Sequence, residues 1–352
     1  MTEISRQQFE MLPREVNIEV TQRCNLSCPF CHNRNSFAGS GRRTQNEILS
    51  TEDVKQIIDR TAQAGIQRIR FTGGEPMMRR DIFALAEYAQ KKGLRTVLNT
   101  NGTLIDKTNA ATVSELFNIC LISLPSGNAA VTDEMSGVGG AHRKKCRALE
   151  AMSGCEQLWC STLMGRTLDP ADIAPLCELM AQLGVMNWFL LRTNGVPADK
   201  MPVSTAYLHS VIREIRKLRD AGRQFPHIGN AVPFCVDNPD LMAEIVDDGA
   251  FFCEARSKMT VNPNGQFVVD YCINKIVGNA LTDDYAAVWQ SPELMRFRNG
   301  SLSPTRCQKC RYYERCLGGS RFAAKLIYDD YTQMDPLANP DAVQEDRYRA
   351  AD

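Results

Sequence analysis

The sequence predicts an α/β fold: a partial (β/α)6 barrel of the TIM type followed by a cysteine-rich C-terminal domain. Six short runs rich in Val, Ile, Leu and Phe alternate with helical stretches over residues 16–192, and six cysteines gather after residue 233. Regular alternation of this kind indicates a parallel sheet with right-handed crossovers. Six units suit an open, partial barrel better than a closed eightfold one.

The expected strands are short apolar runs, as buried parallel strands should be. In order they are Val16–Thr21, Arg68–Thr72, Arg95–Thr100, Ile119–Leu124, Gln157–Met164 and Asn187–Arg192. Ser50 and Asp53 form a predicted capping box that opens the first helix, and Gly65 ends it. The expected helices are Thr51–Ala64, Arg80–Lys92, Ala171–Leu183 and, after the barrel, Thr205–Ala221.

These elements divide the chain into five parts. They are an N-terminal extension (1–15), the barrel (16–195), a linker and helix (196–232), the cysteine-rich domain (233–335) and a polar tail (336–352). The cysteine-rich domain has few periodic segments and cannot bury much core, so we expect metal sites to stabilise it.

The composition excludes several classes of protein. Lys and Arg number 41, as do Asp and Glu, so the formal net charge is zero and nucleic acid is not an expected partner. No apolar run approaches the roughly 18 residues of a membrane span. The start, MTEISRQQFEML, lacks the order of a secretion signal. We therefore expect a cytoplasmic protein that does not bind a membrane.

The 14 cysteines are unevenly spread, and in a reducing cytosol clustered cysteines more often bind metal than form disulfides. Five of them fall in predicted strands and helices, where we expect buried small hydrophobic side chains: Cys120, Cys146, Cys155, Cys160 and Cys177. The others form one group near the N-terminus and one in the C-terminal domain. These two groups are the candidate metal ligands.

The N-terminal group is a triad, Cys24-x3-Cys28-x2-Cys31, directly after the first strand. Three thiolates on one loop can hold three corners of a four-iron cluster and leave the fourth iron to an external ligand. The spacing alone also fits a zinc site. Because chemistry gathers at the carboxyl ends of parallel barrel strands, the position favours the functional cluster.

Polar residues and glycines follow the next strands at the same edge. Gly73, Gly74, Glu75 and Pro76 end the second strand, where glycines permit close backbone approach and a carboxylate can accept from an ammonium group. The third strand runs into the turn Asn99-Thr100-Asn101-Gly102, and the fourth ends in Ser123-Leu124-Pro125-Ser126-Gly127. Each turn alone has an ordinary structural interpretation, but four such features at four successive strand ends favour one shared site.

The triad resembles the signature of the radical S-adenosylmethionine (radical SAM) enzymes, C-x3-C-x-aromatic-C, with Phe30 in the aromatic place. This resemblance implies a [4Fe-4S] cluster whose open iron chelates the amino and carboxylate groups of S-adenosylmethionine. Reductive cleavage then gives methionine and a 5′-deoxyadenosyl radical, which removes a hydrogen atom from the substrate. A reductant such as flavodoxin or ferredoxin is an implied partner.

The other strand ends are similar to further motifs of this family. Gly73–Pro76 is similar to the GGEP motif that holds the methionyl amine, and Asn101 lies in a turn similar to the TNG turn. Ser123 stands where peptide-modifying relatives have a serine that contacts the cofactor, although Pro125 replaces their aspartate.

A cation on the cofactor carboxylate is also expected, because arginine suits bidentate carboxylate binding. Arg143 is the first candidate, with a solvated helix face as its alternative interpretation. Arg192, at the end of the sixth strand, is the second candidate.

The C-terminal cysteines resemble the SPASM/twitch extension of the same enzymes, which carries auxiliary iron–sulfur clusters. Relatives with two auxiliary clusters usually have a cysteine where Ser320 stands and another downstream, whereas no cysteine follows Cys316 here. We therefore expect one complete auxiliary [4Fe-4S] cluster, bound by Cys253 and Cys272 with two of Cys307, Cys310 and Cys316. Two clusters, one with a non-cysteine ligand or an open iron, are the alternative, and a zinc ribbon is another.

Two residues of this region are candidates for catalysis. Cys235 either completes a cluster, gives a hydrogen atom to a substrate radical as an epimerase needs, or is a packed thiol. Asp270, two residues before Cys272, is a candidate base, although in relatives the carboxylate follows the cysteine and here Ile273 does.

The resemblance therefore implies a radical SAM enzyme that oxidises or epimerises a small molecule of the amino sugar or nucleoside type. A maturase of a ribosomally made precursor peptide is the alternative, and a non-catalytic zinc or iron–sulfur electron carrier is the hypothesis from another class. Because only residues 1–15 precede the first strand, a fused leader-binding domain is not expected, and this favours a small-molecule substrate.

Overall fold

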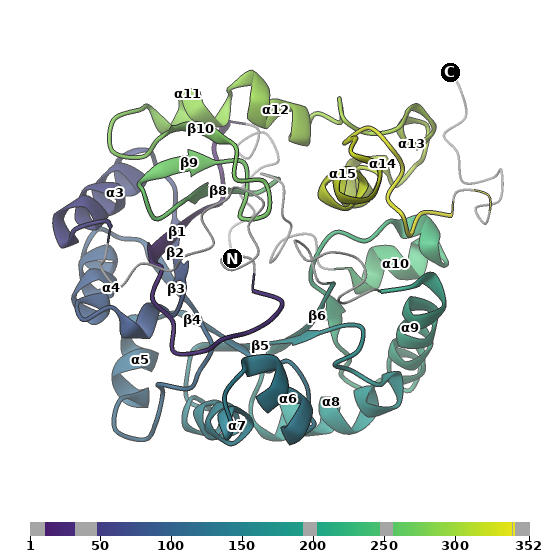
Figure 1. The fold of residues 1–352 in the computed structure, drawn as a ribbon, viewed down its shortest axis with the longest axis horizontal. Helices are drawn as coiled ribbons and strands as arrows, with labels where there is room; N and C mark the ends of the chain where they lie inside the picture. Colours follow the sequence, from purple (N-terminus) through teal and green to yellow (C-terminus); the bar gives the residue numbers. More distant parts are fainter. Residues whose placement is uncertain (1–10, 32–47, 193–202, 247–255, 340, 342–352) are drawn as a thin grey trace.

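The computed structural model describes residues 11–31, 48–192, 203–246, 256–339 and 341. Cys253, one of the predicted cluster ligands, lies outside these residues. Within them the chain forms one curved sheet with helices around its outer face (Figure 1). No helix in this part of the protein combines the length and the apolar character that a membrane span requires.

The sheet has ten strands in the order β10-β9-β8-β1-β2-β3-β4-β5-β6-β7. The barrel strands are all parallel: β1 (Glu15–Thr21), β2 (Arg68–Gly73), β3 (Arg95–Thr100), β4 (Ile119–Ser123), β5 (Gln157–Leu163), β6 (Asn187–Leu191) and the short β7 (His227–Ile228). The six predicted strands and the partial-barrel fold class are confirmed. β7 lies in the segment predicted as linker and helix.

Helices cover the convex face between successive strands (Figure 1): α3 (Thr51–Gln63), α4 (Ile82–Lys91), α5 (Ala110–Leu116), α6 (Ala129–Ser136), α7 (Ala141–Ala151), α8 (Ile173–Gln182), α9 (Thr205–Asp220) and α10 (Pro239–Ile245). The predicted capping box is present, since Asp53 N donates to Ser50 Oγ at 3.1 Å and Ser50 N donates to Asp53 Oδ2 at 2.9 Å. Short 3-10 turns, η1 (Pro76–Met78) and η2 (Pro170–Asp172), precede α4 and α8. Both helices begin two residues later than predicted, and η2 occupies the two residues by which α8 is shortened.

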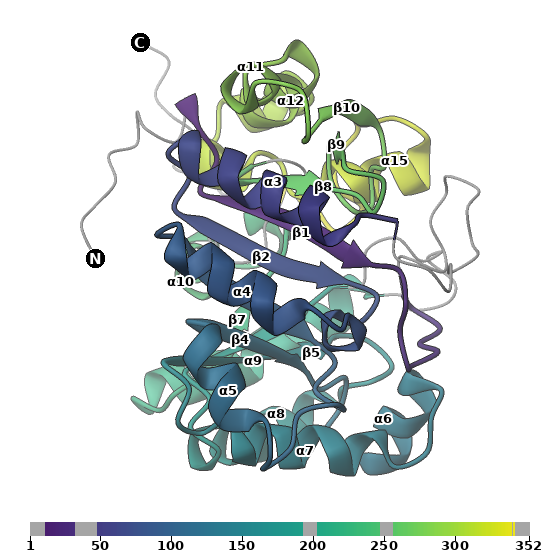
Figure 2. The ribbon, with the colours of Figure 1, turned by 90° about the vertical axis from the view of Figure 1, so that its left-hand side faces the viewer.

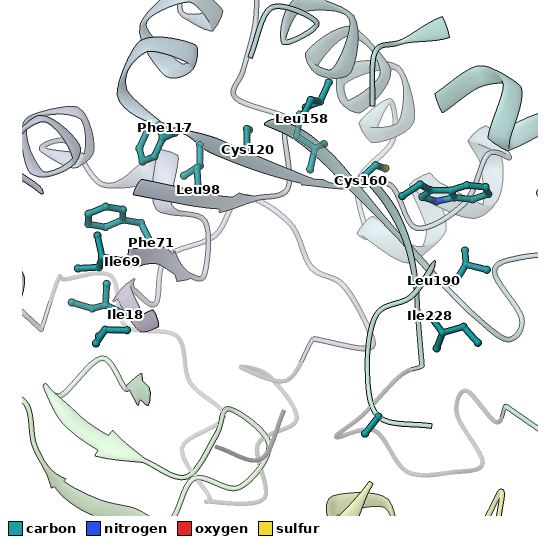
Figure 3. Packing of buried hydrophobic residues seen from close by; sticks show 14 of the residues in the cluster. Ile18, Ile69, Phe71, Leu98, Phe117, Cys120, Leu158, Cys160, Leu190 and Ile228 are labelled. Carbon is teal, nitrogen blue, oxygen red and sulfur yellow. The ribbon is translucent and has the colours of Figure 1, made fainter. Parts of the chain in front are cut away.

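The main core lies between the sheet and these helices. Because side chains alternate along a strand, every second residue faces outward into this layer. Figure 3 shows this outer row running from strand to strand: Ile18, Ile69, Phe71, Leu98, Cys120, Leu158, Cys160, Leu190 and Ile228. Cys120, Cys160 and Cys177 are buried in this core, and Cys146 and Cys155 pack against it, as predicted.

The inner face of the sheet is apolar on one side and charged on the other. A second apolar cluster fills the side of β3 to β6, with Val97, Ile119, Leu121, Trp159 and Phe189. On the side of β1 and β2, buried Glu15 pairs with Arg70 at 2.6 Å and with Arg68 at 2.5 Å. Both groups lie at the amino-terminal and middle positions of their strands, so they form the floor of the barrel.

The C-terminal domain continues the barrel sheet. Its strand β8 (Lys258–Val261) pairs in parallel with β1, and β9 (Gln266–Val268) and β10 (Ile276–Asn279) follow as antiparallel neighbours. The rest of the domain is helical: α11 (Tyr285–Trp289), α12 (Pro292–Arg298), α13 (Thr305–Gln308), α14 (Tyr313–Cys316) and α15 (Arg321–Tyr328). Figure 2 shows this domain beside β1, far from α7 and α8.

The C-terminal domain also contacts the other edge of the barrel. Arg192 follows β6, and its Nη1 lies 2.9 Å from Oδ2 of Asp335, with both side chains buried. The pairing of β8 with β1 and this ion pair together connect the C-terminal domain to both sides of the barrel sheet.

Candidate active site

The cysteine triad lies on the loop after β1, and all three thiols are half-buried. Leu26, which is buried, anchors the loop, and its N–H donates to Cys24 Sγ at 3.4 Å. Burial and then the neighbouring thiols of Cys31 and Cys24 raise the pKa of Cys28 to about 11. The three sulfurs are therefore close enough to interact electrostatically. As thiolates they would repel one another without a bound cation, which is the arrangement that an iron–sulfur cluster needs.

The glycine pair after β2 packs directly on the triad loop. Gly74 N donates to Thr21 O at 2.7 Å, and Glu75 N donates to Arg23 O at 2.7 Å. A Cβ on Gly73 would lie 2.3 Å from Thr21 O, and one on Gly74 would lie 2.1 Å from Arg23 O. The two glycines are therefore required for this close backbone approach, which sets the position of the cysteines.

Glu75 joins the end of β2 to the end of β3. Its buried carboxylate accepts hydrogen bonds from Thr100 Oγ1 at 2.7 Å, Asn101 N at 2.7 Å and Met77 N at 3.0 Å. Burial raises the pKa of this carboxyl, and the hydrogen bonds oppose the rise. A carboxylate has about four acceptor sites, so most of its capacity serves the protein itself. Its contact with the methionyl amine stays a prediction, as does a role for Pro76, which opens η1.

Asn101 connects the turn after β3 to the triad loop. Its Nδ2 donates to Asn25 Oδ1 at 2.9 Å and lies 3.9 Å from Cys24 Sγ, while its Oδ1 accepts from Thr103 N at 2.9 Å. Asn25 also donates to Thr103 Oγ1 at 2.8 Å. The turn therefore orients the first cysteine, and Phe30 lies half-buried on the same loop.

Lys145 is a residue of this site that the sequence analysis missed. It lies on α7 and is buried, and its Nζ donates to Asn101 O at 2.7 Å and to Ser123 O at 2.8 Å. Burial lowers the pKa of this lysine, and the nearby Cys28 and Glu75 oppose that change. Helical periodicity could have identified it, because Ala141, Lys145, Ala148 and Leu149 form the buried face of α7.

The two predicted arginines lie differently. Arg143 is on the exposed face of α7, so the cation that this helix directs to the strand ends is Lys145. Arg192 is held by Asp335, and its backbone exchanges hydrogen bonds with the Asn230 side chain at 2.8 and 2.5 Å. Binding of the cofactor carboxylate by either arginine stays a prediction. Ser123 is at the end of β4, with Ser161 Oγ at 3.4 Å from its own Oγ.

The C-terminal cysteines are divided between two places. Cys235, on the 3-10 turn η3 (Phe234–Val236), lines one cavity together with Cys307, Cys310 and Cys316. Cys272 lines a different cavity. No three His, Cys, Asp or Glu side chains of the described residues converge on a single ion position. A cubane cluster does not need such convergence, because each thiolate binds its own iron.

Asp270 is buried, and its Oδ1 accepts a hydrogen bond from Cys272 N at 2.6 Å. Asp270 N in turn donates to Ile273 O at 3.2 Å. The carboxylate therefore holds the turn that carries Cys272. Its role as a base stays a prediction.

Comparison with known proteins agrees with this arrangement. The model of the radical SAM superfamily matches residues 18–180, and that of the SPASM iron–sulfur cluster-binding domain matches residues 253–312. The chain is 31% identical over 346 residues to the AdoMet-dependent heme synthase of Oleidesulfovibrio alaskensis, covering 91% of this chain and 85% of that protein. It is 24% identical over 362 residues to the PqqA peptide cyclase of Bradyrhizobium diazoefficiens, covering 97% and 90%.

The fold is similar to that of SuiB from Streptococcus suis, with a TM-score of 0.71 at 18% identity over 94% of this chain and 78% of that one. SuiB has also been solved bound to its precursor peptide SuiA. The triad loop, the strand-end motifs and the length of the shared sequence lead to one conclusion. The chain belongs to the radical SAM superfamily and is a radical SAM enzyme with a C-terminal SPASM iron–sulfur domain.

Proposed function

We propose that this enzyme oxidises a small molecule by removing a hydrogen atom from it after reductive cleavage of S-adenosylmethionine. The substrate radical then loses a proton and one electron, and the auxiliary iron–sulfur cluster of the SPASM domain accepts that electron. When bound, the triad cluster and S-adenosylmethionine supply the 5′-deoxyadenosyl radical. The observation that carries the proposal is the loop of Cys24, Cys28 and Cys31, held at the carboxyl edge by Gly74 and Asn101. The cysteines bind the cluster, and the barrel floor around Trp159 and Phe189 excludes water from below.

The position of Cys235 favours oxidation over epimerisation. An epimerase needs a hydrogen-atom donor that faces the substrate radical. Cys235 instead shares a cavity of the C-terminal domain with three other cysteines, and its pKa is raised to about 12, first by burial and then by the thiols of Cys316 and Cys307. The candidate donor is therefore engaged elsewhere, which supports net oxidation.

The inner face of the sheet favours a substrate with both apolar and polar parts. Leu163 and Leu191 pair at the ends of β5 and β6 and, by strand alternation, face inward above Trp159 and Phe189. On β1, by the same alternation, the inward-facing residues Glu15, Asn17 and Glu19 are polar, so this side of the inner face has the opposite character.

A tetrapyrrole carboxylate has this mixed character, whereas an amino sugar or a nucleoside has little apolar surface. The similarity to an AdoMet-dependent heme synthase supports the tetrapyrrole within the small-molecule class. A precursor peptide is the second candidate, supported by the similarity to a PqqA peptide cyclase.

The test is an anaerobic assay of 5′-deoxyadenosine formation by the reconstituted, reduced enzyme. The probes are Fe-coproporphyrin III, an amino sugar, a nucleoside and a short ribosomal precursor peptide, and the control is the Cys28→Ala variant. We expect the tetrapyrrole to stimulate cleavage, with one S-adenosylmethionine consumed per product and no deuterium taken up from heavy water. Stimulation by the peptide alone, or solvent deuterium in the product, would overturn the proposal, as would cleavage that persists in Cys28→Ala.

A further inference from the structure

Four cysteines from two distant parts of the chain line one cavity in the C-terminal domain. Cys307, Cys310 and Cys316 come from α13, α14 and the turn between them, whereas Cys235 comes from η3, just before α10. All four thiols are half-buried. The cavity therefore brings sulfur ligands from both parts of the chain to one place.

A backbone N–H group points at one sulfur of this set. Phe234 N, the neighbour of Cys235, donates to Cys316 Sγ at 3.4 Å. Hydrogen bonds to the sulfurs are a general feature of protein-bound iron–sulfur clusters, and they stabilise the added charge of the reduced cluster.

The backbone after Cys316 turns sharply beside the cavity. Leu317, Gly318 and Gly319 all have left-handed φ angles of 48°, 78° and 82°. Leu317 N donates to Tyr313 O at 2.8 Å and Gly319 N donates to Cys316 O at 3.1 Å, so the turn folds back on the end of α14. A Cβ on Gly318 would lie 3.4 Å from Cys307 Sγ and 3.3 Å from Pro304 Cδ, so a side chain there would crowd the cavity.

Ser320 stands where relatives of this family usually carry a further cysteine, and here it has a structural role. Ser320 is buried, and its Oγ caps α15 by accepting from Ala323 N at 3.0 Å. Its N–H donates to Asp335 Oδ2 at 2.8 Å. Cys272 lines the separate cavity that also contains Phe322, Leu326 and Tyr331. Neither residue belongs to the four-thiol cavity.

We propose that Cys235 is the fourth ligand of an auxiliary [4Fe-4S] cluster whose other ligands are Cys307, Cys310 and Cys316. This ligand set replaces the one expected from the sequence, which joined Cys253 and Cys272 to two of the last three cysteines. The inference depends on the proposed function only in that the domain binds iron–sulfur clusters, and it holds for any substrate.

The assignment gives the cluster a structural role as well. Arg311 Nη2 on the cluster loop lies 2.9 Å from Asp240 of α10, and Arg315 of α14 donates to Ala243 O at 2.7 Å. In Figure 1, α10 and α14 are neighbours. A cluster held by Cys235 therefore links the segment that leaves the barrel to the C-terminal domain.

The experiment uses the full-length chain with Cys24, Cys28 and Cys31 all changed to Ala, so that its iron belongs to auxiliary sites alone. Cys235→Ala and Cys272→Ala are then added separately, and iron, sulfide and the EPR spectrum of the reduced protein are measured. A cubane contributes about four irons per chain. We expect Cys235→Ala to lose these irons or keep a three-iron form, and Cys272→Ala to retain the EPR signal of this cluster.

Cys235→Ser keeps the shape of the site and guards against simple misfolding. Because an oxygen ligand replaces sulfur, we expect this variant to keep the cluster with an altered EPR spectrum and midpoint potential. Unchanged iron content and spectrum in Cys235→Ala and Cys235→Ser would overturn the assignment. Loss of the signal in Cys272→Ala with retention in Cys235→Ala would overturn it equally. S-adenosylmethionine cleavage is also measured in a Cys235→Ala variant with an intact triad. If cleavage is retained, the triad is functional, so a failure of the ligand assignment can be told apart from a failure of the proposed function.

Discussion

The ammonium group of Lys145 donates a hydrogen bond to the carbonyl oxygen of Ser123 at 2.8 Å, at the carboxyl end of β4. The same nitrogen binds Asn101 O at the end of β3, at 2.7 Å. A buried lysine of α7 therefore joins two strand ends directly below the triad loop, and its charge acts on Cys28 and Cys24. This arrangement places a fixed positive charge beside the cluster ligands.

Lys145→Met should lower the reduction potential of the triad cluster, because an added electron is stabilised by a nearby cation in a medium of low dielectric constant. Each buried carbonyl left without a partner should also cost about 1–3 kcal/mol of stability. An EPR-monitored redox titration and urea unfolding measure the two effects. The adjacent Lys144 is exposed, so Lys144→Met is the matched control. An unchanged potential in Lys145→Met would contradict the electrostatic role.

Gly74→Ala should reduce the iron bound by the triad. The new methyl group would lie 2.1 Å from Arg23 O, and since that atom is backbone, the triad loop must move. Overpacking of this kind costs about 1–3 kcal/mol. The control is Gly154→Ala, since no atom lies within 4 Å of a Cβ at that position. Iron content per chain is the measurement, and equal iron in both variants would refute the packing argument.

Glu15→Gln should destabilise the barrel floor in a pH-dependent way. Burial alone would raise the pKa of Glu15, but Arg70 and Arg68 outweigh it and lower the pKa from 4.5 to about 2. A carboxyl with a lowered pKa stabilises the folded state above its ordinary value, and this contribution is lost as the pH falls toward the folded-state value. Removing one partner of a buried pair costs about 3–5 kcal/mol.

The difference in unfolding free energy between wild type and Glu15→Gln should therefore be largest at neutral pH and shrink as the pH falls from 4.5 toward 2. Urea unfolding at several pH values measures it. Glu115 is exposed, so Glu115→Gln should show no such difference. A difference for Glu15→Gln that is constant with pH would rule out the ion pair as its cause.

Arg192→Met and Asp335→Asn should each loosen the contact between the C-terminal domain and β6. Arg192 Nη1 lies 2.9 Å from Asp335 Oδ2, and both side chains are buried. Removing one partner should lower the free energy of unfolding by about 3–5 kcal/mol. Because both changes remove the same interaction, their effects on stability should be strongly non-additive in a double-mutant cycle. If Arg192 instead binds the cofactor carboxylate, Arg192→Met will weaken S-adenosylmethionine binding while Asp335→Asn will not.

The local sequence pattern was sufficient to predict the barrel and the cysteine triad. Strand–helix alternation, the Ser50–Asp53 capping box and the spacing of Cys24, Cys28 and Cys31 are properties of neighbouring residues. The ligand set of the auxiliary cluster and the cation at the strand ends are not local properties, because both depend on which segments meet. The pairing of β8 with β1 was not expected either, since an edge strand accepts any suitable partner.

The order of the parallel strands and the chemistry of the residues at their ends can be predicted from the chain alone, because hydrophobic period and motif spacing are properties of contiguous stretches. The folded arrangement is needed to show which cation reaches those ends, which thiols share a cavity, and that Arg192 pairs with Asp335, 143 positions away. Such contacts depend on the packing of whole elements against one another, and no short stretch of sequence contains both partners.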